Sequence, residues 1–340
     1  MSSNGAVRVG INGFGRIGRN FFRAARARGA NVEVVGVNDL TSPATLAHIL
    51  EYDSVLKKLD GQVEVTADGI SVDGKSFRVT AERDPKALPW GEMEVDVVIE
   101  STGFFTDRGK AAAHIDAGAP RVVISAPATG ADATFVVGVN DDTFDPEAHK
   151  VVSNASCTTN CFVPMVKVLD DAFGVKQGLM TTVHAMTNDQ NLLDLQHKDL
   201  RRGRSAPINI TPSSTGAARA TSLVLAAMKG RLDGTALRVP IPVGSITDFT
   251  AIVDREVSVE EVNEAFRAAA ESGPLSGVLD YTADPIVSAD IVGSPASCTF
   301  DSELTMTMGT MVKVLGWYDN EWGYSNRLVD LVEIVGAANK

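Results

Sequence analysis

Two side chains of this 340-residue sequence could together perform nucleophilic catalysis, Cys157 and His184. Cys157 stands where a strand pattern changes into a helix pattern, and the free amides and dipole of a helix N-terminus favour the thiolate form of a cysteine. His184 ends a strand-like segment further along the chain. A histidine that reached the sulfur could act as its base. Buried cysteines and isolated histidines are also common core residues, so these two residues alone leave a structural role open.

A Gly-x-Gly-x-x-Gly loop offers a second kind of chemistry, the binding of a dinucleotide. The loop joins the strand-like run Val7–Ile11 to a helix pattern, and its glycines are Gly13, Gly15 and Gly18. We expect Gly13 to allow a tight turn, Gly15 a close approach of the backbone to pyrophosphate, and Gly18 close packing of the helix on the strand. Asp39 follows the next expected strand, where an acid can bind the ribose hydroxyls and repel a 2′-phosphate. The pattern therefore favours NAD over NADP.

The elements that must position these groups differ between the two halves of the chain. In the first half, short Val- and Ile-rich runs alternate with amphipathic stretches, which is typical of a parallel sheet with right-handed crossovers. The expected strands are 7–11, 32–37, 95–100 and 122–125, the expected helices are 17–28 and 110–117, and hairpins are expected between 61 and 79.

The second half of the sequence predicts an α+β arrangement with an antiparallel or mixed sheet. The expected helices are 158–173, 215–229, 259–271 and 325–335, and the expected strands are 178–185, 245–253, 304–308 and 313–318. The connection Thr187–Thr215 is polar and has no clear periodicity. A connection of that length suggests a functional loop or a subunit contact.

The composition narrows the class of protein. With 31 Lys and Arg against 43 Asp and Glu, the formal net charge is −12, which argues against nucleic-acid or anionic-membrane binding. A hydrophobic content of 44% fits a packed globular protein. The N-terminus resembles no signal peptide and no stretch is long enough to span a bilayer, so we expect a cytoplasmic protein.

The three cysteines do not predict a metal centre or a disulfide framework. An odd, small number of cysteines favours a reducing compartment. Cys157 and Cys161 form Cys-x-x-x-Cys without a second ligand pair, so we expect no metal and a structural role for Cys161.

Four motifs together resemble those of phosphorylating glyceraldehyde-3-phosphate dehydrogenases. They are the glycine loop and the segments 156–161, 182–184 and 317–321, and the similarity runs in register over nearly the whole chain. The resemblance implies an α/β protein with two domains. An NAD-binding domain with a Rossmann-type doubly wound sheet would cover 1–156 and be completed by a C-terminal helix over 320–340. An α+β catalytic domain would cover 157–319 and contain the loop 187–215.

The resemblance also implies the reaction. Cys157 would attack an aldehyde to form a thiohemiacetal, and His184 would take the hydroxyl proton while hydride passes to NAD. The resulting thioester would be attacked by inorganic phosphate, with His184 again as the acid–base partner. The product would be the acyl phosphate 1,3-bisphosphoglycerate.

The family pattern also assigns binding residues. Arg238 and Thr187 would hold the phosphate of the substrate, and the attacking phosphate would be received by Ser156, Thr158, Arg202, Thr215 and Gly216. Guanidinium groups, hydroxyls and a backbone amide suit phosphate oxygens. From composition alone, the arginines of the segment 200–204 could equally be a salt-bridged loop, and Arg201 and Arg204 remain structural candidates.

The cofactor residues implied by the family lie on both halves of the chain. They are Gly13, Gly15, Arg16, Ile17, Asp39, Arg83, Thr102, Ser125 and Asn320. Asn320 would hydrogen-bond the nicotinamide carboxamide and so select the ring face. The family further implies a homotetramer, with the connection Thr187–Thr215 packed between subunits.

Three positions depart from common bacterial members of the family. Phe162 stands where Leu is usual, Met186 where an aromatic residue is frequent, and Gln196 where NAD-dependent relatives often have Pro. One hypothesis is that Phe162 and Met186 reshape access to the thiol, and neutral drift in core packing is at least as good an interpretation. Gln196 leaves the strictness of NAD selectivity open.

Two other functions fit much of the same sequence. A relative that acts on erythrose 4-phosphate would share the cofactor acid, the thiol and the histidine. A binding or regulatory protein on the same fold would have no need of them, and the intact thiol, histidine and arginines argue against it.

Overall fold

The computed structural model describes residues 5–338, which form two compact units. The first unit covers 5–135, 141–155 and 325–338 of these residues, and the second covers 136–140 and 156–324. The N-terminal residues 1–4 and the last two residues of the expected C-terminal segment, 339–340, lie outside the described residues.

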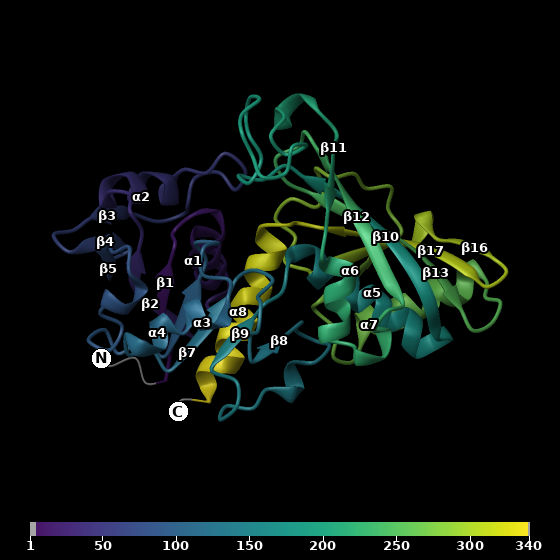
Figure 1. Ribbon diagram of the computed structural model, residues 1–340, viewed down its shortest axis with the longest axis horizontal. Coiled ribbons are helices and arrows are strands. Elements are labelled where there is room, and N and C mark those ends of the chain that lie inside the picture. Colours follow the sequence, from purple (N-terminus) through teal and green to yellow (C-terminus); the bar gives the residue numbers. More distant parts are fainter. Residues whose placement is uncertain (1–4, 339–340) are drawn as a thin grey trace. The chain divides into compact units, whose positions relative to one another are not determined.

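The first unit is built on a nine-stranded sheet with the spatial order β3-β4-β5-β2-β1-β6-β7-β9-β8 among the described residues (Figure 1). All neighbours pair in parallel except the antiparallel β3–β4 and β4–β5. The strands are β1 Val7–Asn12, β2 Val32–Asn38, β3 Val63–Val65, β4 Gly69–Val72, β5 Lys75–Thr80, β6 Val97–Glu100, β7 Arg121–Ile124, β8 Ala133–Thr134 and β9 Val151–Ser153.

The strand order of this sheet explains where a nucleotide would bind. Chain order runs outward from β1 in both directions, to β2 on one side and β6 on the other. In open parallel sheets, ligands bind at the carboxyl ends of strands where the order reverses in this way. The expected Rossmann-type doubly wound sheet with added hairpins is confirmed, and the glycine loop follows β1 at the reversal.

Two helices of the first unit begin or end at clear local sequence signals. α1, Arg16–Arg28, ends at Gly29 in the left-handed conformation, and α2, Pro43–Glu51, begins after Ser42, whose side chain accepts from Thr45 N. The expected helix 110–117 is wrong in part, because two short helices replace it: α3 Arg108–Ala111 and α4 Ala113–Asp116. At the break, Ile115 N donates to Ala112 O, an i to i−3 bond that tightens the turn.

The second unit contains an eight-stranded mixed sheet with the order β11-β12-β10-β13-β17-β15-β14, and β16 pairs with β17. Its neighbours pair antiparallel except β10–β12 and β14–β15. The strands are β10 Val175–Ala185, β11 Thr211–Ser214, β12 Leu232–Val239, β13 Ser245–Val253, β14 Leu279–Thr282, β15 Cys298–Asp301, β16 Met306–Met308 and β17 Met311–Tyr318. The sequence prediction missed β11, β12, β14 and β15.

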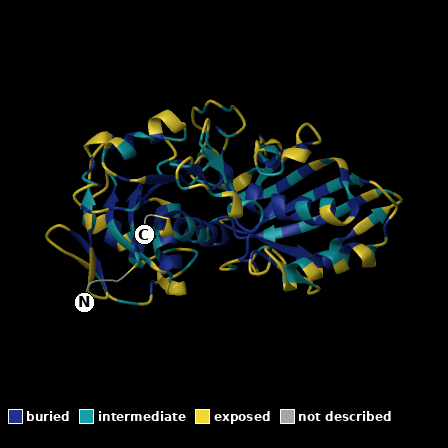
Figure 2. Cartoon of the chain, turned by 90° about the horizontal axis from the view of Figure 1, so that it is seen from below, coloured by how far each residue is buried: buried dark blue, intermediate teal, exposed yellow. Residues whose placement is uncertain are grey.

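One face of this second sheet is packed and the other is open. The helices α5 Cys157–Phe173 and α7 Val259–Glu271 cover the packed face, where Phe162 meets Phe249 edge to face and Phe266 stacks on Phe300. On β13, buried residues alternate strictly with half-buried ones, as expected for a strand with one core-facing side. The colouring of Figure 2 shows the buried strands beside the exposed connections.

The expected helix 215–229 is wrong. Three short turns take its place: α6 Ala217–Ala220, and the 3₁₀ turns Thr221–Leu223 and Ala226–Met228. Thr221 Oγ1 bonds Ala217 O and Ser222 Oγ bonds Arg219 O, so hydroxyl groups compete with the backbone for the helical carbonyls.

The last helix, α8 Trp322–Ala337, begins in the second unit and continues in the first. Within residues 5–338, no helix combines the length and apolar character needed to cross a membrane.

Candidate active site

Cys157 is the first residue of α5, as the sequence predicts. Ser156 caps the helix, because its side chain accepts from Thr159 N at 3.0 Å. Just before the cap, Ala155 has φ of 55°, a left-handed conformation that costs energy for a residue with a side chain. The turn therefore places Cys157, a half-buried residue, at a strained junction.

His184 lies beside the thiol. It comes near the end of β10, is 3% exposed, and its Nε2 lies 3.4 Å from Cys157 Sγ. On the other side of the ring, Nδ1 lies 2.7 Å from Ala185 O. An imidazole that donates from Nδ1 to a carbonyl presents the lone pair of Nε2 to the sulfur, which is the arrangement of a general base.

Arg238 brings a positive charge to this pair. It lies on β12, where it is the register partner of His184 on β10. Its Nη1 lies 2.7 Å from His184 Nδ1 and 3.1 Å from Ala185 O. The parallel pairing of β10 and β12, which the sequence prediction missed, is thus what places the cation next to the base.

Burial dominates the protonation of the thiol and the imidazole. It raises the pKa of Cys157 to about 11, although the Arg238 charge and hydrogen bonds from Thr158 act in the opposite direction. Burial, followed by the Arg238 charge, lowers the pKa of His184 to about 3. Burial of the thiol and the charge and hydrogen bonds around it therefore act on the pKa of Cys157 in opposite directions. Nε2 faces the sulfur and is the ring nitrogen that can exchange a proton with it.

Tyr318 holds the two catalytic elements together, a role that the sequence prediction missed. Its hydroxyl lies 2.9 Å from Thr158 Oγ1 on α5 and 2.7 Å from Thr182 Oγ1 on β10. The ring meets that of His184 edge to face, with 5.9 Å between centroids. Burial raises the pKa of Tyr318, so the phenol stays protonated. Tyr318 lies within the motif 317–321, and its place in that motif was the feature of the sequence that could have indicated this role.

Arg202, the other expected phosphate ligand, is held differently. Its Nη1 lies 2.5 Å from Asp189 Oδ2, its Nε donates to Ser213 Oγ and its Nη2 donates to Ser214 O. Asp199 Oδ2 lies 3.6 Å from Nε. The alternative of a salt-bridged loop therefore describes the surroundings of Arg202, and Asp189 is a residue that the sequence prediction missed.

The remaining expected phosphate ligands occupy segments next to these groups. The Thr158 hydroxyl is buried and bonded to Tyr318, and Thr187 N donates to Gln190 Oε1. Thr215 follows Ser214, whose carbonyl binds Arg202, and the Thr215 hydroxyl accepts from Ala217 N. Gly216, which follows it, is exposed.

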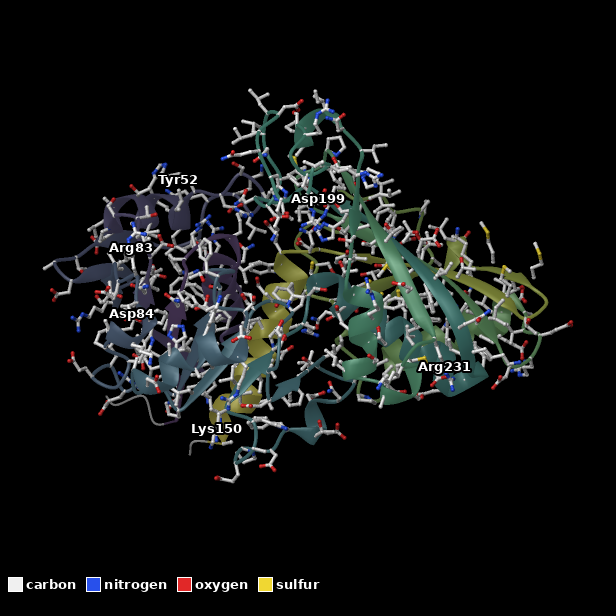
Figure 3. The ribbon with its side chains drawn as sticks, in the orientation of Figure 1. Tyr52, Arg83, Asp84, Lys150, Asp199 and Arg231 are labelled. Carbon is white, nitrogen blue, oxygen red and sulfur yellow. The ribbon has the colours of Figure 1, made fainter. Side chains whose placement is uncertain are left out.

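A separate cavity of about 370 Å³ lies in the first unit at the carboxyl end of β1. It is lined by five of the expected cofactor residues: Gly13, Gly15, Asp39, Arg83 and Thr102. Asp39 Oδ2 accepts from Phe14 N at 2.9 Å, so the acid is anchored to the glycine loop itself. Arg83, labelled in Figure 3, follows β5 at the same end of the sheet.

The glycine loop suits a pyrophosphate. Gly13 has φ of 93°, and a Cβ on Gly18 would lie 2.4 Å from Gly13 O, so larger residues are excluded at both positions. A Cβ on Gly15 would meet nothing within 4 Å, so this position is open to a ligand. No side chain caps α1 at Gly15. The first amides of a helix suit an anion, and α1 begins directly after the glycine loop, so the residues fit NAD.

A buried acid beneath the cavity was also missed. Glu100 ends β6, and its Oε1 accepts from both the amide and the hydroxyl of Thr102. Its Oε2 accepts from Asn12 Nδ2 at 2.6 Å and lies 2.9 Å from His114 Nε2. A charged residue at the end of a buried strand needs such partners, which was the signal in the sequence.

The other expected cofactor residues do not line this cavity. Arg16 forms an ion pair with Asp53, Ile17 lies in the first turn of α1, and Ser125 Oγ donates to Glu100 O. Asn320 lies in the second unit, where its Oδ1 accepts from Gly244 N and Ser245 Oγ. Those contacts leave its amide NH₂ as the group that could donate to a ligand.

The two unusual residues near the motifs have different surroundings. Phe162 is fully buried against Phe249, and five positions along a helix turn its side chain about 140° away from that of Cys157. It belongs to the core, which favours packing drift over a role in thiol access. Met186 is partly exposed, directly after β10.

Comparisons with known proteins match both units. Residues 7–108 match the NAD-binding domain of glyceraldehyde 3-phosphate dehydrogenase, and residues 156–320 match the C-terminal domain. Glyceraldehyde-3-phosphate dehydrogenase 2 of Streptomyces avermitilis is 62% identical over 331 residues, 97% of this chain and 98% of the relative. The enzyme of Streptomyces coelicolor is 61% identical over the same shares. That of Priestia megaterium is 57% identical over 98% of this chain and 99% of its own.

Proposed function

Because the chain belongs to the glyceraldehyde-3-phosphate dehydrogenase family, we propose that it oxidises D-glyceraldehyde 3-phosphate to 1,3-bisphosphoglycerate with NAD and inorganic phosphate. The observation that carries this proposal is the distance of 3.4 Å between Cys157 Sγ and His184 Nε2, with Arg238 beside the same imidazole. A thiol, a base and a cation at one point match an aldehyde that carries a phosphate. The first unit would bind NAD, and the second would hold the reacting groups.

His184 would act first on the thiol. Its Nε2 would accept the Cys157 proton as sulfur attacks the aldehyde carbon, and would return that proton to the carbonyl oxygen, which becomes the hydroxyl of a thiohemiacetal. His184 then takes the hydroxyl proton as hydride leaves the same carbon, which becomes the carbonyl of a thioester. NAD, when bound, supplies the acceptor of that hydride.

The same pair would release the product. A phosphate oxygen attacks the thioester carbon, the carbon–sulfur bond breaks, and the sulfur leaves as a thiolate. The thiolate takes up a proton held by His184, so the enzyme returns to its starting form. A thioester suits this step because it is attacked more readily than an oxygen ester.

Two anion subsites would serve the two phosphate groups. Arg238 and Thr187 would hold the phosphate of the substrate, while Ser156, Thr158, Arg202, Thr215 and Gly216 would receive inorganic phosphate. The Arg202 charge contributes to the lowered pKa of His184, which supports its proximity to the reacting pair. The assignment of Arg238 is better supported, because its guanidinium contacts the imidazole of His184 directly.

The cofactor would bind at the glycine loop. The amides at Gly15, Arg16 and Ile17 would meet the pyrophosphate, and Asp39 and Arg83 would meet the adenosine. Thr102 and Ser125 would border the cofactor, and the amide of Asn320 would donate to the nicotinamide carboxamide. The anchoring of Asp39 by Phe14 N supports this assignment, since it fixes an acid at the cavity wall.

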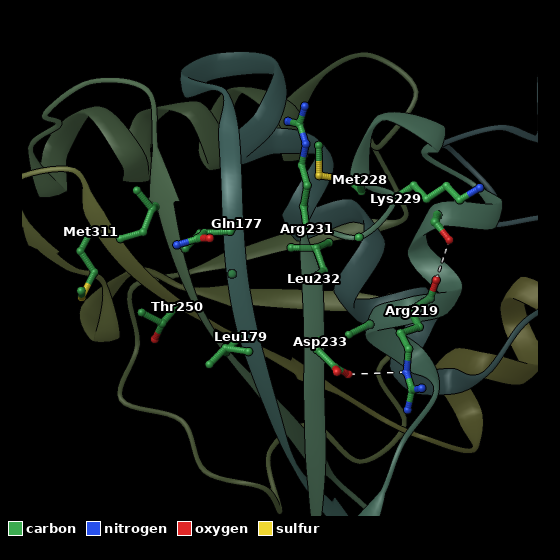
Figure 4. A pocket seen from close by; sticks show the side chains of 16 residues that line it. Gln177, Leu179, Arg219, Met228, Lys229, Arg231, Leu232, Asp233, Thr250 and Met311 are labelled. Carbon is green, nitrogen blue, oxygen red and sulfur yellow. Dashed lines mark hydrogen bonds and ion pairs between the residues drawn. The ribbon is translucent and has the colours of Figure 1, made fainter.

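A homotetramer remains part of the proposal. The open face of the second sheet carries a shallow pocket of about 950 Å³ around Leu179, Thr250 and Met311 (Figure 4). The connection 187–215 adds six strongly exposed apolar residues: Leu192, Leu193, Leu195, Leu200, Ile208 and Ile210. Apolar surface of this kind is typical of an interface between subunits. The cytoplasmic location stays a prediction from the sequence.

A direct assay tests the proposed function. NADH absorbance is followed with D-glyceraldehyde 3-phosphate or erythrose 4-phosphate, with and without phosphate, and with NAD or NADP. We expect the highest kcat/KM with the first aldehyde, continuous turnover only with phosphate, and no turnover in Cys157→Ser. Turnover that is equal in Cys157→Ser would contradict the proposal, and a higher kcat/KM for erythrose 4-phosphate would favour the alternative relative.

A further inference from the structure

A chain of buried polar side chains runs beneath the cofactor cavity, across the ends of the neighbouring strands β5, β2, β1 and β6. Thr80 ends β5, Asn38 ends β2, Asn12 ends β1 and Glu100 ends β6. The Thr80 hydroxyl donates to Asn38 Oδ1 at 2.9 Å, Asn38 Nδ2 donates to Asn12 Oδ1 at 2.7 Å, and Asn12 Nδ2 donates to Glu100 Oε2 at 2.6 Å. Each strand end is thus bonded to the next through a side chain.

The direction of the hydrogen bonds in this chain is fixed by groups that can play only one role. At one end, the backbone amide of Glu82 donates to Asn38 Oδ1 at 2.8 Å and its carbonyl accepts from Asn38 Nδ2 at 2.9 Å, so the Asn38 amide has one orientation. At the other end, Trp90 Nε1, which can only donate, lies 3.0 Å from His114 Nδ1. The His114 proton therefore sits on Nε2, which donates to Glu100 Oε2 at 2.9 Å.

Glu100 is the acceptor on which the chain converges. In addition to Asn12 and His114 at Oε2, its Oε1 accepts from the amide of Thr102 at 2.8 Å and from the Thr102 hydroxyl. Four donors thus point at a side chain that is 1% exposed. An amide in its place would turn its NH₂ group toward donors in either orientation, so only a carboxylate satisfies all four.

The segment 101–104, which Glu100 holds, supports the glycine loop. Ser101 Oγ donates to Gly13 O at 2.6 Å. A Cβ on Gly13 would lie 2.7 Å from Thr102 N, so the backbones of the loop and the segment are in close contact. Because Thr102 bonds Glu100 through both its amide and its hydroxyl, loss of the carboxylate would release the segment on which the loop rests.

Asn38 holds another part of the cavity lining. Its two bonds to the backbone of Glu82 fix the residue before Arg83, and both Glu82 and Arg83 line the cavity, as Thr102 does. A dinucleotide is long enough to contact both parts of the lining at once. A lining that is held in place before binding spares the cost of ordering it when the ligand enters.

We propose that Glu100 is a positioning residue for NAD: its carboxylate fixes the segment 101–104 and the chain through Asn12 and Asn38, and so orders the cavity before the cofactor binds. This inference deepens the proposed function and rests on it, because it takes NAD as the ligand of the cavity. Glu100 contacts neither the substrate nor the reacting thiol. Cofactor affinity should therefore depend on Glu100, whereas the chemistry at Cys157 should not.

A binding measurement separates this role from a purely structural one. The Kd of NAD is measured by calorimetry, and kcat and the KM values are measured by NADH formation, in the wild-type enzyme and in Glu100→Gln. We expect the Kd and the KM for NAD to rise at least about tenfold, while kcat at saturating NAD and the KM for the aldehyde change less than about twofold. Glu92→Gln is the matched control, because Glu92 is an exposed acid of the same unit, and it should keep the wild-type Kd.

A double variant, Glu100→Gln with Asn12→Asp, tests whether the order of donors and acceptors matters. It moves the carboxylate by one place along the chain. The acid introduced at position 12 can accept from Asn38 and from His114, whose Nε2 lies 3.5 Å from Asn12 Nδ2. The amide introduced at position 100 can donate to that acid and accept from Thr102. We expect the Kd of NAD to return to within about threefold of the wild-type value.

Two substitutions of Thr102 test the same link without altering the buried charge. Thr102→Val removes the hydroxyl bond to Glu100 and should raise the Kd of NAD severalfold. Thr102→Ser keeps that hydroxyl and should leave the Kd near the wild-type value. Both variants retain the amide that donates to Glu100, so the segment still has one of its two bonds.

Every outcome decides the question. A Kd of Glu100→Gln equal to that of the wild type would overturn the inference even if its unfolding temperature fell, because Glu100 would then serve stability alone. If Glu100→Gln does not fold, a raised Kd in the folded double variant or an unchanged Kd in Thr102→Val would overturn it. Those results leave the proposed function intact, whereas absence of NAD-dependent turnover in the wild-type enzyme would refute the proposed function itself.

Discussion

Two arginines with the same proposed task, Arg238 and Arg202, have opposite surroundings. Arg238 has no acid partner among residues 5–338 and touches the imidazole of the catalytic pair. Arg202 is held by Asp189 and by two groups of the segment 213–214. A guanidinium without an acid partner gains a charge-assisted bond when phosphate binds, whereas one paired with a carboxylate exchanges one anion for another. The difference predicts a strong subsite for the substrate and a weak one for inorganic phosphate.

The largest loss of activity should follow from replacing Arg238, the arginine without an acid partner. Arg238→Met should lower kcat/KM for D-glyceraldehyde 3-phosphate on the order of 100-fold or more, because a buried charge pair with the phosphate is lost. Steady-state kinetics measure the change, and Arg204→Met is the control, because Arg204 is exposed and pairs with Asp194. A loss below tenfold would mean that Arg238 is not the main phosphate anchor.

The same substitution should shift the reactivity of the thiol. The Arg238 charge lowers the pKa of both Cys157 and His184, so its removal raises both. The thiolate is then populated only at higher pH, and the alkylation rate of Cys157 by iodoacetamide should rise at higher pH than in the wild type. If the alkylation rate of the variant rose at the same pH as in the wild type, or at a lower pH, the Arg238 charge would not be what lowers the pKa of Cys157.

Removal of the paired arginine should have a smaller effect. Arg202→Met should raise the KM for inorganic phosphate roughly tenfold and leave the KM for the aldehyde nearly unchanged, since bound phosphate must first displace Asp189. Initial rates at varied phosphate give both constants. Equal losses toward both substrates would erase the distinction between the two subsites.

Neutralising Asp189, the ion-pair partner of Arg202, should lower the KM for inorganic phosphate. Asp189→Asn removes the internal competitor for Arg202, so the KM for phosphate should fall by about twofold to fivefold, the range of a half-exposed ion pair. The comparison uses the same phosphate titration. A higher KM in this variant would show that Asp189 positions Arg202 for phosphate instead of competing with it.

The smallest expected effect concerns the phenol that joins the two catalytic elements. Tyr318→Phe removes the hydroxyl that bridges Thr158 and Thr182, at a cost of about 1 kcal/mol in the free energy of unfolding. The rate of acylation should fall only severalfold, because Cys157 and His184 keep their own elements. Denaturant unfolding and burst kinetics measure the two effects, and a loss of activity as large as that of Arg238→Met would contradict this ranking.

The first unit could be predicted from the sequence better than the second. Its strands are continuous Val and Ile runs, and its helices carry local signals, such as Ser42 before α2 and Gly29 after α1. In the segment 215–229 the pattern predicts one helix and the structure has short turns, because the hydroxyls of Thr221 and Ser222 bond helical carbonyls. Propensity within a short window does not reveal that competition.

In the candidate site, too, the sequence predicted local features better than contacts between distant segments. Cys157 could be predicted from its own motif, and the distance to His184 agrees with the pairing that was expected. The protonation of the pair could not be predicted, since it depends on how deeply β10 and α5 are buried. The contact of Arg238 with His184 and the bridge made by Tyr318 depend on strand pairing across long stretches of sequence. Pairing partners of that kind are set by the whole fold and not by local spacing.

Covalent attachment of the substrate to Cys157 is tested most directly by rapid-quench mass spectrometry. Enzyme, NAD and D-glyceraldehyde 3-phosphate are mixed without inorganic phosphate and quenched in acid. We predict a stoichiometric acyl group on the peptide that contains Cys157, which disappears when phosphate is added before the quench. An NADH burst without an acyl group on that cysteine would contradict the account.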